Sequence, residues 1–235
     1  MKKLKLSIIM ILLFPAFAYA GGGGATAMMM GTSGSAAAAI CTTQNFEDTG
    51  VWTEADGETD ITLSGSTITV DTMIGTVTSY VRRNYGVNGI TNIKVDFHTK
   101  WTNCSGPWVT VGIMTLGNTA QACLNDLDIA NDGIVAQFTL DGSSVYRITL
   151  IDRQDNNSDA YIAAINTDYY CTFERVHATG VNTLKIYSDS DRTTLLDTLT
   201  VTDDGTAYIY LTALSSERAG GAVSSTGVID SVCIY

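Results

Sequence analysis

The residues from Ile93 to Trp101 alternate between apolar and polar side chains, and this pattern constrains the fold more than any other feature of the chain. Successive side chains of a β-strand point to opposite faces of a sheet, so a period of two is typical of a strand with one buried face. Apart from an interruption at Thr99, the residues predicted to be buried are Ile93, Val95, Phe97 and Trp101. The residues predicted to face solvent are Lys94, Asp96, His98 and Lys100.

Other short β-rich segments follow one another along the chain, with turn residues between them. Ser64-Gly65-Ser66 separates two of them and is typical of a hairpin, and residues 152–159 are predicted to form a polar loop. No stretch of ten residues combines a helical period with caps. The sequence therefore predicts an all-β antiparallel fold, a sandwich or a barrel, of which we favour a two-sheet sandwich. The predicted strands are 61–63, 67–70, 77–85, 93–101, 108–116, 134–140, 145–151, 161–165, 169–176, 184–187, 195–201, 208–214 and 228–235.

The first twenty residues have the pattern of an export signal. Three lysines precede an apolar run over residues 6–14, and Ala18-Tyr19-Ala20 offers small residues at a cleavage site. The alternative is a retained membrane anchor, but a helix that spans a bilayer needs about 20 apolar residues and this run is shorter. We therefore predict a signal peptide at 1–20 and a secreted, cell-surface or periplasmic protein.

Charge and composition bound the domain organisation and the partners. Removal of residues 1–20 takes away three lysines and no acid, which changes the net charge from −11 to −14. Such a surface repels phosphate backbones, so the sequence predicts no nucleic-acid partner. Residues 21–44 are rich in Gly, Ala and Met and are predicted to be a flexible leader, the alternative being a short helix that docks a partner. One domain is predicted over residues 45–235.

Five cysteines follow the predicted signal peptide, an odd number that leaves at least one unpaired or bonded between chains. Disulfides are the expected state in an oxidising compartment. We predict the pairs Cys104–Cys123, which brackets one strand and its loop, and Cys41–Cys233, which joins the two ends of the domain. Cys171 lies in a strongly β segment and is predicted to be a buried free thiol.

Several segments together resemble a known superfamily. They are residues 133–150, 168–175, 184–189 and 196–200, with 46–52 and 227–232 similar to terminal strands that lie side by side. The pattern and strand order resemble the laminin-G-like branch of the concanavalin A-like lectin/glucanase superfamily. The resemblance implies a jelly-roll of two large curved antiparallel sheets. Members of the superfamily bind glycans or proteins, often with calcium, or hydrolyse polysaccharides, and many are adhesive or structural parts of larger assemblies.

Aromatic residues on the outward side of predicted strands are candidates for glycan contact, because sugar C–H faces pack on aromatic rings while hydroxyls bond to polar side chains nearby. Aromatic residues in sandwiches are also common in the core, and that alternative stays open. Tyr208 or Tyr210 could join the main candidates. The predicted ligand-binding residues are Trp108, Tyr80, Tyr85, Arg82, Arg83 and Asn84.

Oxygen-bearing side chains gather in two segments that could bind calcium, which needs six to eight oxygen ligands. Solvated turns are the alternative for both, and the first lacks the EF-hand spacing. The first segment, residues 125–133, ends in a glycine and offers Asn125 together with the predicted ligands Asp126, Asp128, Asn131 and Asp132. The second contains Asp152, Asp155, Asn156, Asn157 and Asp159.

Catalytic patterns are weak. Glu54, Asp56 and Glu58 have the spacing of the acids in the glucanase branch, but Gly57 weakens a strand there and no apolar residues alternate with the acids. The two histidines, His98 and His177, are predicted as a surface and a turn residue, and no Gly-x-Ser-x-Gly elbow occurs. We therefore favour a non-catalytic recognition or adhesion module that binds glycan. The alternatives are a structural component of a surface appendage or phage-like assembly and, third, a polysaccharide hydrolase.

Overall fold

The structure is a computed structural model that describes residues 41–235 except for 57–60, 75–78, 106–108, 119–132 and 217–223. The chain divides between Ala38 and Ala39, and every described residue lies in the C-terminal unit. The predicted signal peptide lies outside the described residues, as does most of the predicted leader. Within the described ranges, no helix is long and apolar enough to cross a membrane.

Two antiparallel sheets form the described unit, and the first contains both terminal strands, β1 and β15. In this sheet, sheet A, the strand order is β13-β12-β11-β6-β15-β4-β3, and β1 pairs with β15. The N-terminal neighbour of the last strand is thus β1 at residues 42–43, and not the segment 46–52 that was likened to a terminal strand. The strands are β1 (Thr42–Thr43), β3 (Ile61–Ser64), β4 (Thr67–Ile74), β6 (Ile93–Ser105), β11 (Tyr169–Val176), β12 (Val181–Tyr187), β13 (Leu195–Thr202) and β15 (Ser224–Ile234).

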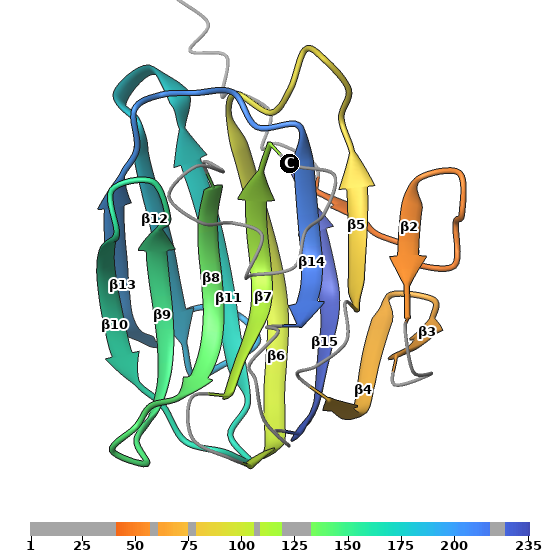
Figure 1. Cartoon of the computed structure of the whole chain (residues 1–235), viewed down its shortest axis with the longest axis vertical. Coiled ribbons are helices and arrows are strands. Elements are labelled where there is room, and N and C mark those ends of the chain that lie inside the picture. The colour runs from red at the N-terminus through yellow and green to blue at the C-terminus, as the bar shows by residue number, and fades with distance from the viewer. Residues whose placement is uncertain (1–40, 57–60, 75–78, 106–108, 119–132, 217–223) are drawn as a thin grey trace, which may run out of the picture. The chain divides into compact units, whose positions relative to one another are not determined.

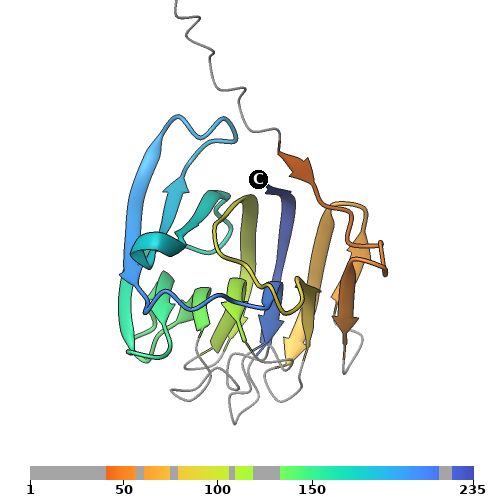
Figure 2. The ribbon, with the colours of Figure 1, turned by 90° about the horizontal axis from the view of Figure 1, so that it is seen from above.

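The second sheet, sheet B, lies against sheet A and completes a two-layer sandwich (Figures 1 and 2). Its strand order is β10-β9-β8-β7-β14-β5-β2, and every pair is antiparallel. The prediction of an all-β jelly-roll sandwich is confirmed. The strands are β2 (Trp52–Ala55), β5 (Tyr80–Asn84), β7 (Val109–Gly117), β8 (Gly133–Leu140), β9 (Tyr146–Asp152), β10 (Asn157–Ile162) and β14 (Tyr210–Ser216).

The core lies between the two inner faces, where alternate residues of the strands meet. In β6 the predicted inward residues are all buried, and the ring of Trp101 stacks 6.1 Å from that of Phe138 in β8 on the opposite sheet. β12 has the simplest alternation, with Asn182, Leu184 and Ile186 buried and its other residues half-buried. Burial of these apolar surfaces is the main stabilising contribution to such a sandwich.

Two segments differ from the prediction. The predicted polar loop at 152–159 is instead a tight turn, because β9 continues to Asp152 and Asn157 already pairs with it to begin β10. Asn156 adopts a φ of 53° in that turn, a left-handed conformation that asparagine tolerates better than most residues. β10 ends at Ile162, so the predicted strand at 161–165 was placed too late. Residues 46–52, likened to a terminal strand, form turns up to residue 51, and the edge strand β2 begins at Trp52.

The cysteines follow the sequence prediction in part. Cys41 and Cys233 form a disulfide with a Cα–Cα distance of 5.6 Å, which confirms that pair. Cys171 is a buried free thiol, as predicted, and burial raises its pKa to about 12. Cys104 is also a buried free thiol, against the predicted bond to Cys123, and Cys123 itself lies outside the described residues. Burial, opposed by a hydrogen bond with Ser225, raises the pKa of Cys104 to about 12.

A fully buried ion pair fixes the loops at one end of the sandwich. Arg175 at the end of β11 donates from Nε to Asp203 at 3.1 Å, and both side chains are 0% exposed. The guanidinium also donates to the backbone carbonyls of Ile90, Thr91 and Thr206. Asn182, Tyr208 and the backbone N–H of Gly205 donate to the Asp203 carboxylate. This network satisfies two buried charges and connects β11 to the β5–β6 and β13–β14 loops.

Candidate functional site

Strand β5 directs the predicted ligand-binding residues to two different faces. Val81 is fully buried in the core and pairs with Leu214 of β14. Because side chains alternate along a strand, Tyr80, Arg82 and Asn84 therefore point to the outer face of sheet B. Arg83 points to the other side. The five predicted residues that the structure describes do not form one surface.

On that outer face Arg82 lies between two tyrosine rings. Its guanidinium carbon is 4.5 Å from the ring centroid of Tyr80 and 5.0 Å from that of Tyr210. Tyr210 comes from β14, where it pairs with Asn84 and with Gly117 of β7. All three side chains are half-buried, and Nη1 of Arg82 makes no hydrogen bond to any group in the described ranges. We refer to Tyr80, Arg82 and Tyr210 as the tyrosine–arginine cluster.

Small polar side chains lie beside the cluster on the same face. Thr212 pairs with Arg82, and Thr115 of β7 pairs with Thr212. In the next row, Ser215 pairs with Tyr80. Residues directly opposite each other on neighbouring strands share a face, so these hydroxyls lie on the same side of the sheet as the cluster. All three side chains are buried, and the hydroxyls of Thr115 and Ser215 have no hydrogen-bond partner among the described residues.

The remaining predicted ligand residues lie elsewhere. Arg83 donates from Nη1 to Oε1 of Gln44 at 3.2 Å, and its guanidinium carbon lies 4.7 Å from the ring centroid of Tyr85. Tyr85 packs against the hydrophobic core. Burial, partly opposed by the charge of Arg83, raises the pKa of Tyr85. Trp108 lies outside the described residues.

The predicted calcium ligands Asp126, Asp128, Asn131 and Asp132 lie outside the described residues. Within the ranges that the structure describes, no group of three or more His, Cys, Asp or Glu side chains could hold a metal ion. The second predicted loop has structural contacts instead. Asp152 accepts a hydrogen bond from the backbone N–H of Gln154, and Asp159 accepts one from that of Thr200 in β13.

Of the acids weighed as hydrolytic residues, Glu54 lies in β2 at the edge of sheet B. Burial, followed by the charge of Asp56, raises the pKa of Glu54. Asp56 accepts a hydrogen bond from the backbone N–H of Ile61 at 3.2 Å, so part of its role is to hold the chain before β3. Glu58 lies outside the described residues.

The prediction of His98 as a surface residue is wrong. It is 8% exposed and lies between two carboxylates, with Nε2 3.0 Å from Asp168 and Nδ1 3.1 Å from Asp230. Its ring is also 4.8 Å from that of Tyr170. A carboxylate accepts hydrogen bonds, so this arrangement favours the protonated, positively charged imidazole, in which both ring nitrogens donate. Alternation identified the outer face, but partners distant in the sequence cover it.

No family model matches this chain, and no curated protein matches it either. Solved structures do match. A legume lectin-like domain from Entamoeba histolytica has a TM-score of 0.55 at 13% identity, over 79% of this chain and 90% of that chain. The lectin UEA-II, complexed with galactose, has a TM-score of 0.52 at 13% identity, over 78% of this chain and 91% of that chain. The fold is concanavalin A-like.

A third match is the exoplasmic/lumenal domain of VIP36 in a form bound to Ca²⁺ and Man3GlcNAc. Its TM-score is 0.52 at 10% identity, over 82% of this chain and 86% of that chain. The first two of these structural neighbours are named as a lectin-like domain and a lectin. At such low identity the likeness concerns the fold. The laminin-G-like branch predicted from the sequence is not confirmed by these neighbours.

Proposed function

We propose that this chain is an exported, non-catalytic recognition module that binds glycans on the outer face of sheet B. The tyrosine–arginine cluster carries the proposal. A guanidinium held between two half-buried aromatic rings combines rigid apolar surface with hydrogen-bond donors, and such a combination suits the C–H faces and hydroxyls of a sugar. Asn84, on the same face, adds an exposed amide.

The setting of the cluster supports the proposal. It lies on β-strands rather than on a loop, so its side chains are held in position before a ligand binds. The lectin-like neighbours bind sugars in two of the matched structures, galactose for UEA-II and Man3GlcNAc for VIP36. An intramolecular disulfide joins the start and end of the described domain, which agrees with the oxidising compartment that the proposed export implies.

A glycan array probed with the full chain tests the proposal. Arg82→Gln and Tyr210→Ala should each weaken binding of any retained glycan by about tenfold, because each removes a contact of the kind that contributes about 1 kcal/mol or more. Lys185→Gln, on the outer face of β12 in sheet A, is the matched control and should bind as the wild type does. No retained glycan, or equal loss in the control, would contradict the proposal.

We also propose that the segment at residues 125–133 binds calcium. The same array should be probed in calcium and in a chelator. Loss of binding in the chelator, restored by calcium, is the expected result. Equal binding in both conditions would remove calcium from the proposal and leave the glycan site standing.

A structural role in an assembly is the second candidate. The edge strands β10 and β13 carry exposed apolar side chains: Ile162 is 66% exposed and Leu195 is 52% exposed. Exposed apolar groups on unpaired strands favour association with another chain. The mass of the purified protein in solution discriminates the two, since a stable high-order assembly favours this role and a monomer that binds glycan opposes it.

A further inference from the structure

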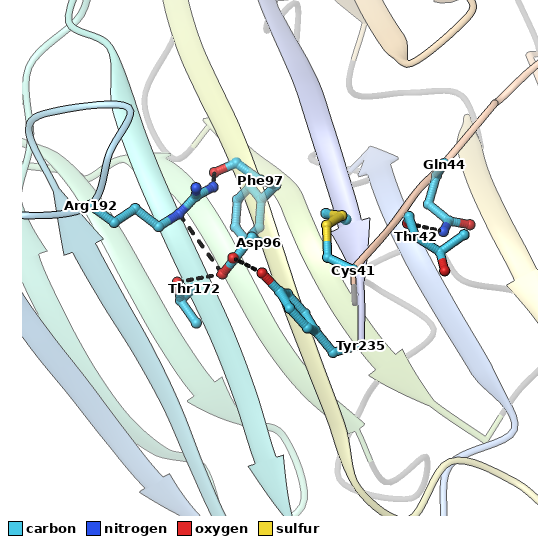
Figure 3. The surroundings of a disulfide bond; sticks show 9 residues. Cys41, Thr42, Gln44, Asp96, Phe97, Thr172, Arg192 and Tyr235 are labelled. Carbon is cyan, nitrogen blue, oxygen red and sulfur yellow. Dashed lines mark hydrogen bonds and ion pairs between the residues drawn. A yellow bond between two sulfur atoms is a disulfide. The ribbon is translucent and has the colours of Figure 1, made fainter. Parts of the chain in front are cut away.

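A hollow lies on the outer face of sheet A, on the other side of the sandwich from the tyrosine–arginine cluster. It is beside the Cys41–Cys233 disulfide (Figure 3). Its volume is about 350 Å³, near the lower end of the range for small-molecule sites. Side chains from β6, β11, β15 and the β12–β13 loop converge on it. Its chemically active lining residues are Asp96, Tyr170, Ser190, Arg192, Ser231 and Tyr235.

One donor and one acceptor in this hollow are close but not bonded to each other. Nε of Arg192 lies 3.8 Å from Oδ1 of Asp96, too far for a hydrogen bond. That Nε is buried and makes no hydrogen bond to any described group. Asp96 is held by Thr172, whose hydroxyl donates at 2.6 Å, and by Tyr235, whose hydroxyl donates at 2.9 Å (Figure 3). The guanidinium therefore keeps donor capacity next to a fixed carboxylate.

The loop that carries Arg192 is held in place by hydrogen bonds of its own. Asp189 accepts from the backbone N–H groups of Thr193 and Thr194, and these bonds are the cause that lowers its pKa to about 2. Arg192 has a φ of 54°, a left-handed conformation that is unusual for a residue with a long side chain. The loop thus presents the guanidinium to the hollow in a fixed direction.

Two tyrosines complete the walls. The ring of Tyr170 lies 4.8 Å from that of His98, at an interplanar angle of 31°. Ser231, another lining residue, donates to Asp230, which bonds to the same histidine. Tyr235 bonds to Asp96, and Nζ of Lys94 lies 4.4 Å from the centroid of its ring. Both aromatic rings are therefore held by neighbouring side chains, which preorganises the walls of the hollow for a ligand.

We propose that this hollow binds a small uncharged polyol, of about the size of one sugar ring. A hydroxyl both accepts and donates, so a ligand hydroxyl can accept from the partly exposed guanidinium of Arg192 and donate to Asp96. An anion would meet the Asp96 carboxylate and a cation would meet Arg192, and both are disfavoured in a partly buried site. The tyrosine rings offer surface to the ligand's C–H groups. The site is separate from the tyrosine–arginine cluster and stands independently of it.

Three ring sugars of one shape and different charge test the inference: glucose, glucuronate and glucosamine. Titrations of the disulfide-intact chain, followed by protein NMR, measure the affinity for each, with myo-inositol as a second neutral probe. The neutral probes should bind, and each charged probe should bind about tenfold more weakly or worse. No shift of signals near Tyr170 and Tyr235 with either neutral probe at tens of millimolar would overturn the inference.

Variants that remove each of the two charges in turn distinguish ligand recognition from a purely structural role of these side chains. Asp96→Asn leaves Arg192 without its negative neighbour and should shift the preference toward glucuronate. Arg192→Gln should shift it toward glucosamine. A loss of folding would weaken the binding of all probes alike, so a reversed order of affinities is the decisive readout. An unchanged order of affinities would contradict the inference. Arg82→Gln, in sheet B, should leave all of these titrations as in the wild type.

Discussion

At the scale of single residues, the polar side chains on the outer face of sheet A are occupied in ways that alternation does not reveal. His98 in β6 bonds to Asp168, in the segment that precedes β11, and to Asp230 in β15, and so connects these three parts of the chain. Lys100 also bonds to Asp168, at 3.0 Å. Burial, the largest influence, acts to lower the pKa of His98, but the hydrogen bonds and charges of Asp230 and Asp168 outweigh it. The net pKa lies above the ordinary value of 6.5.

This raised pKa makes the stability of the protein depend on pH. A group with a higher pKa in the folded state stabilises it fully below the unfolded pKa, and that stabilisation is lost as pH rises through the folded pKa. The free energy of unfolding should therefore fall from mildly acidic to alkaline pH. His98→Gln should cost about 1–2 kcal/mol at acidic pH and less at alkaline pH.

Thermal or denaturant unfolding of both proteins between about pH 5 and pH 9 provides the measurement. The two stability curves should converge as the pH rises. Parallel curves would show that His98 does not titrate in this range and would contradict the assigned charge. Titration of the His98 ring followed by NMR measures the pKa of His98 in the folded state directly.

At the scale of the elements, the network around Arg175 fixes the β5–β6 and β13–β14 loops against β11. Arg175→Gln leaves the buried Asp203 carboxylate without its counter-charge, which should cost about 3–5 kcal/mol in the free energy of unfolding. Arg147→Gln is the matched control, because its ion pair with Asp141 involves a side chain that is 37% exposed. Denaturant unfolding should show a large loss for the first variant and little change for the second. Equal losses would contradict the role of the buried pair.

The elements themselves were largely predictable, since the period of two reports burial on one face. β11 begins and ends where the sequence predicts, and the buried face of β6 is confirmed. The start of β10 was missed because its polar residues Asn157, Ser158 and Asp159 form a strand only by pairing with β9. Propensity is weak for such edge strands, and pairing decides their conformation.

The candidate sites were less predictable, because they combine residues from strands that lie far apart in the sequence. β5 alone indicates that Tyr80 and Arg82 share a face, but only the pairing of β14 with β5 brings Tyr210 to Arg82. Likewise, no local pattern connects Asp96 with Arg192, which approach each other only through the sheet order. Sequence periodicity assigns a face to a residue and does not assign its neighbours.

At the scale of the whole molecule, the disulfide joins residues that are 192 positions apart. Closing so long a loop restricts the unfolded chain strongly, so loss of the bond should cost about 2–5 kcal/mol. The double variant Cys41→Ser/Cys233→Ser should therefore unfold at lower denaturant concentration than the wild type.

A reductant should lower the wild type to the stability of the double variant and leave the double variant unchanged. Denaturant unfolding with and without reductant makes this comparison within one set of samples. A wild type that is insensitive to reduction would show that the bond contributes little to the free energy of unfolding.

The position of this bond also has a mechanical consequence. β1 lies beside β15, and the covalent link between Cys41 and Cys233 closes the chain between them into a ring. A pulling force applied at the two ends of the described chain enters at one cysteine and leaves at the other. Tension therefore passes across two sulfur atoms and leaves the sheets between them unloaded, so the domain can be stretched without being unravelled.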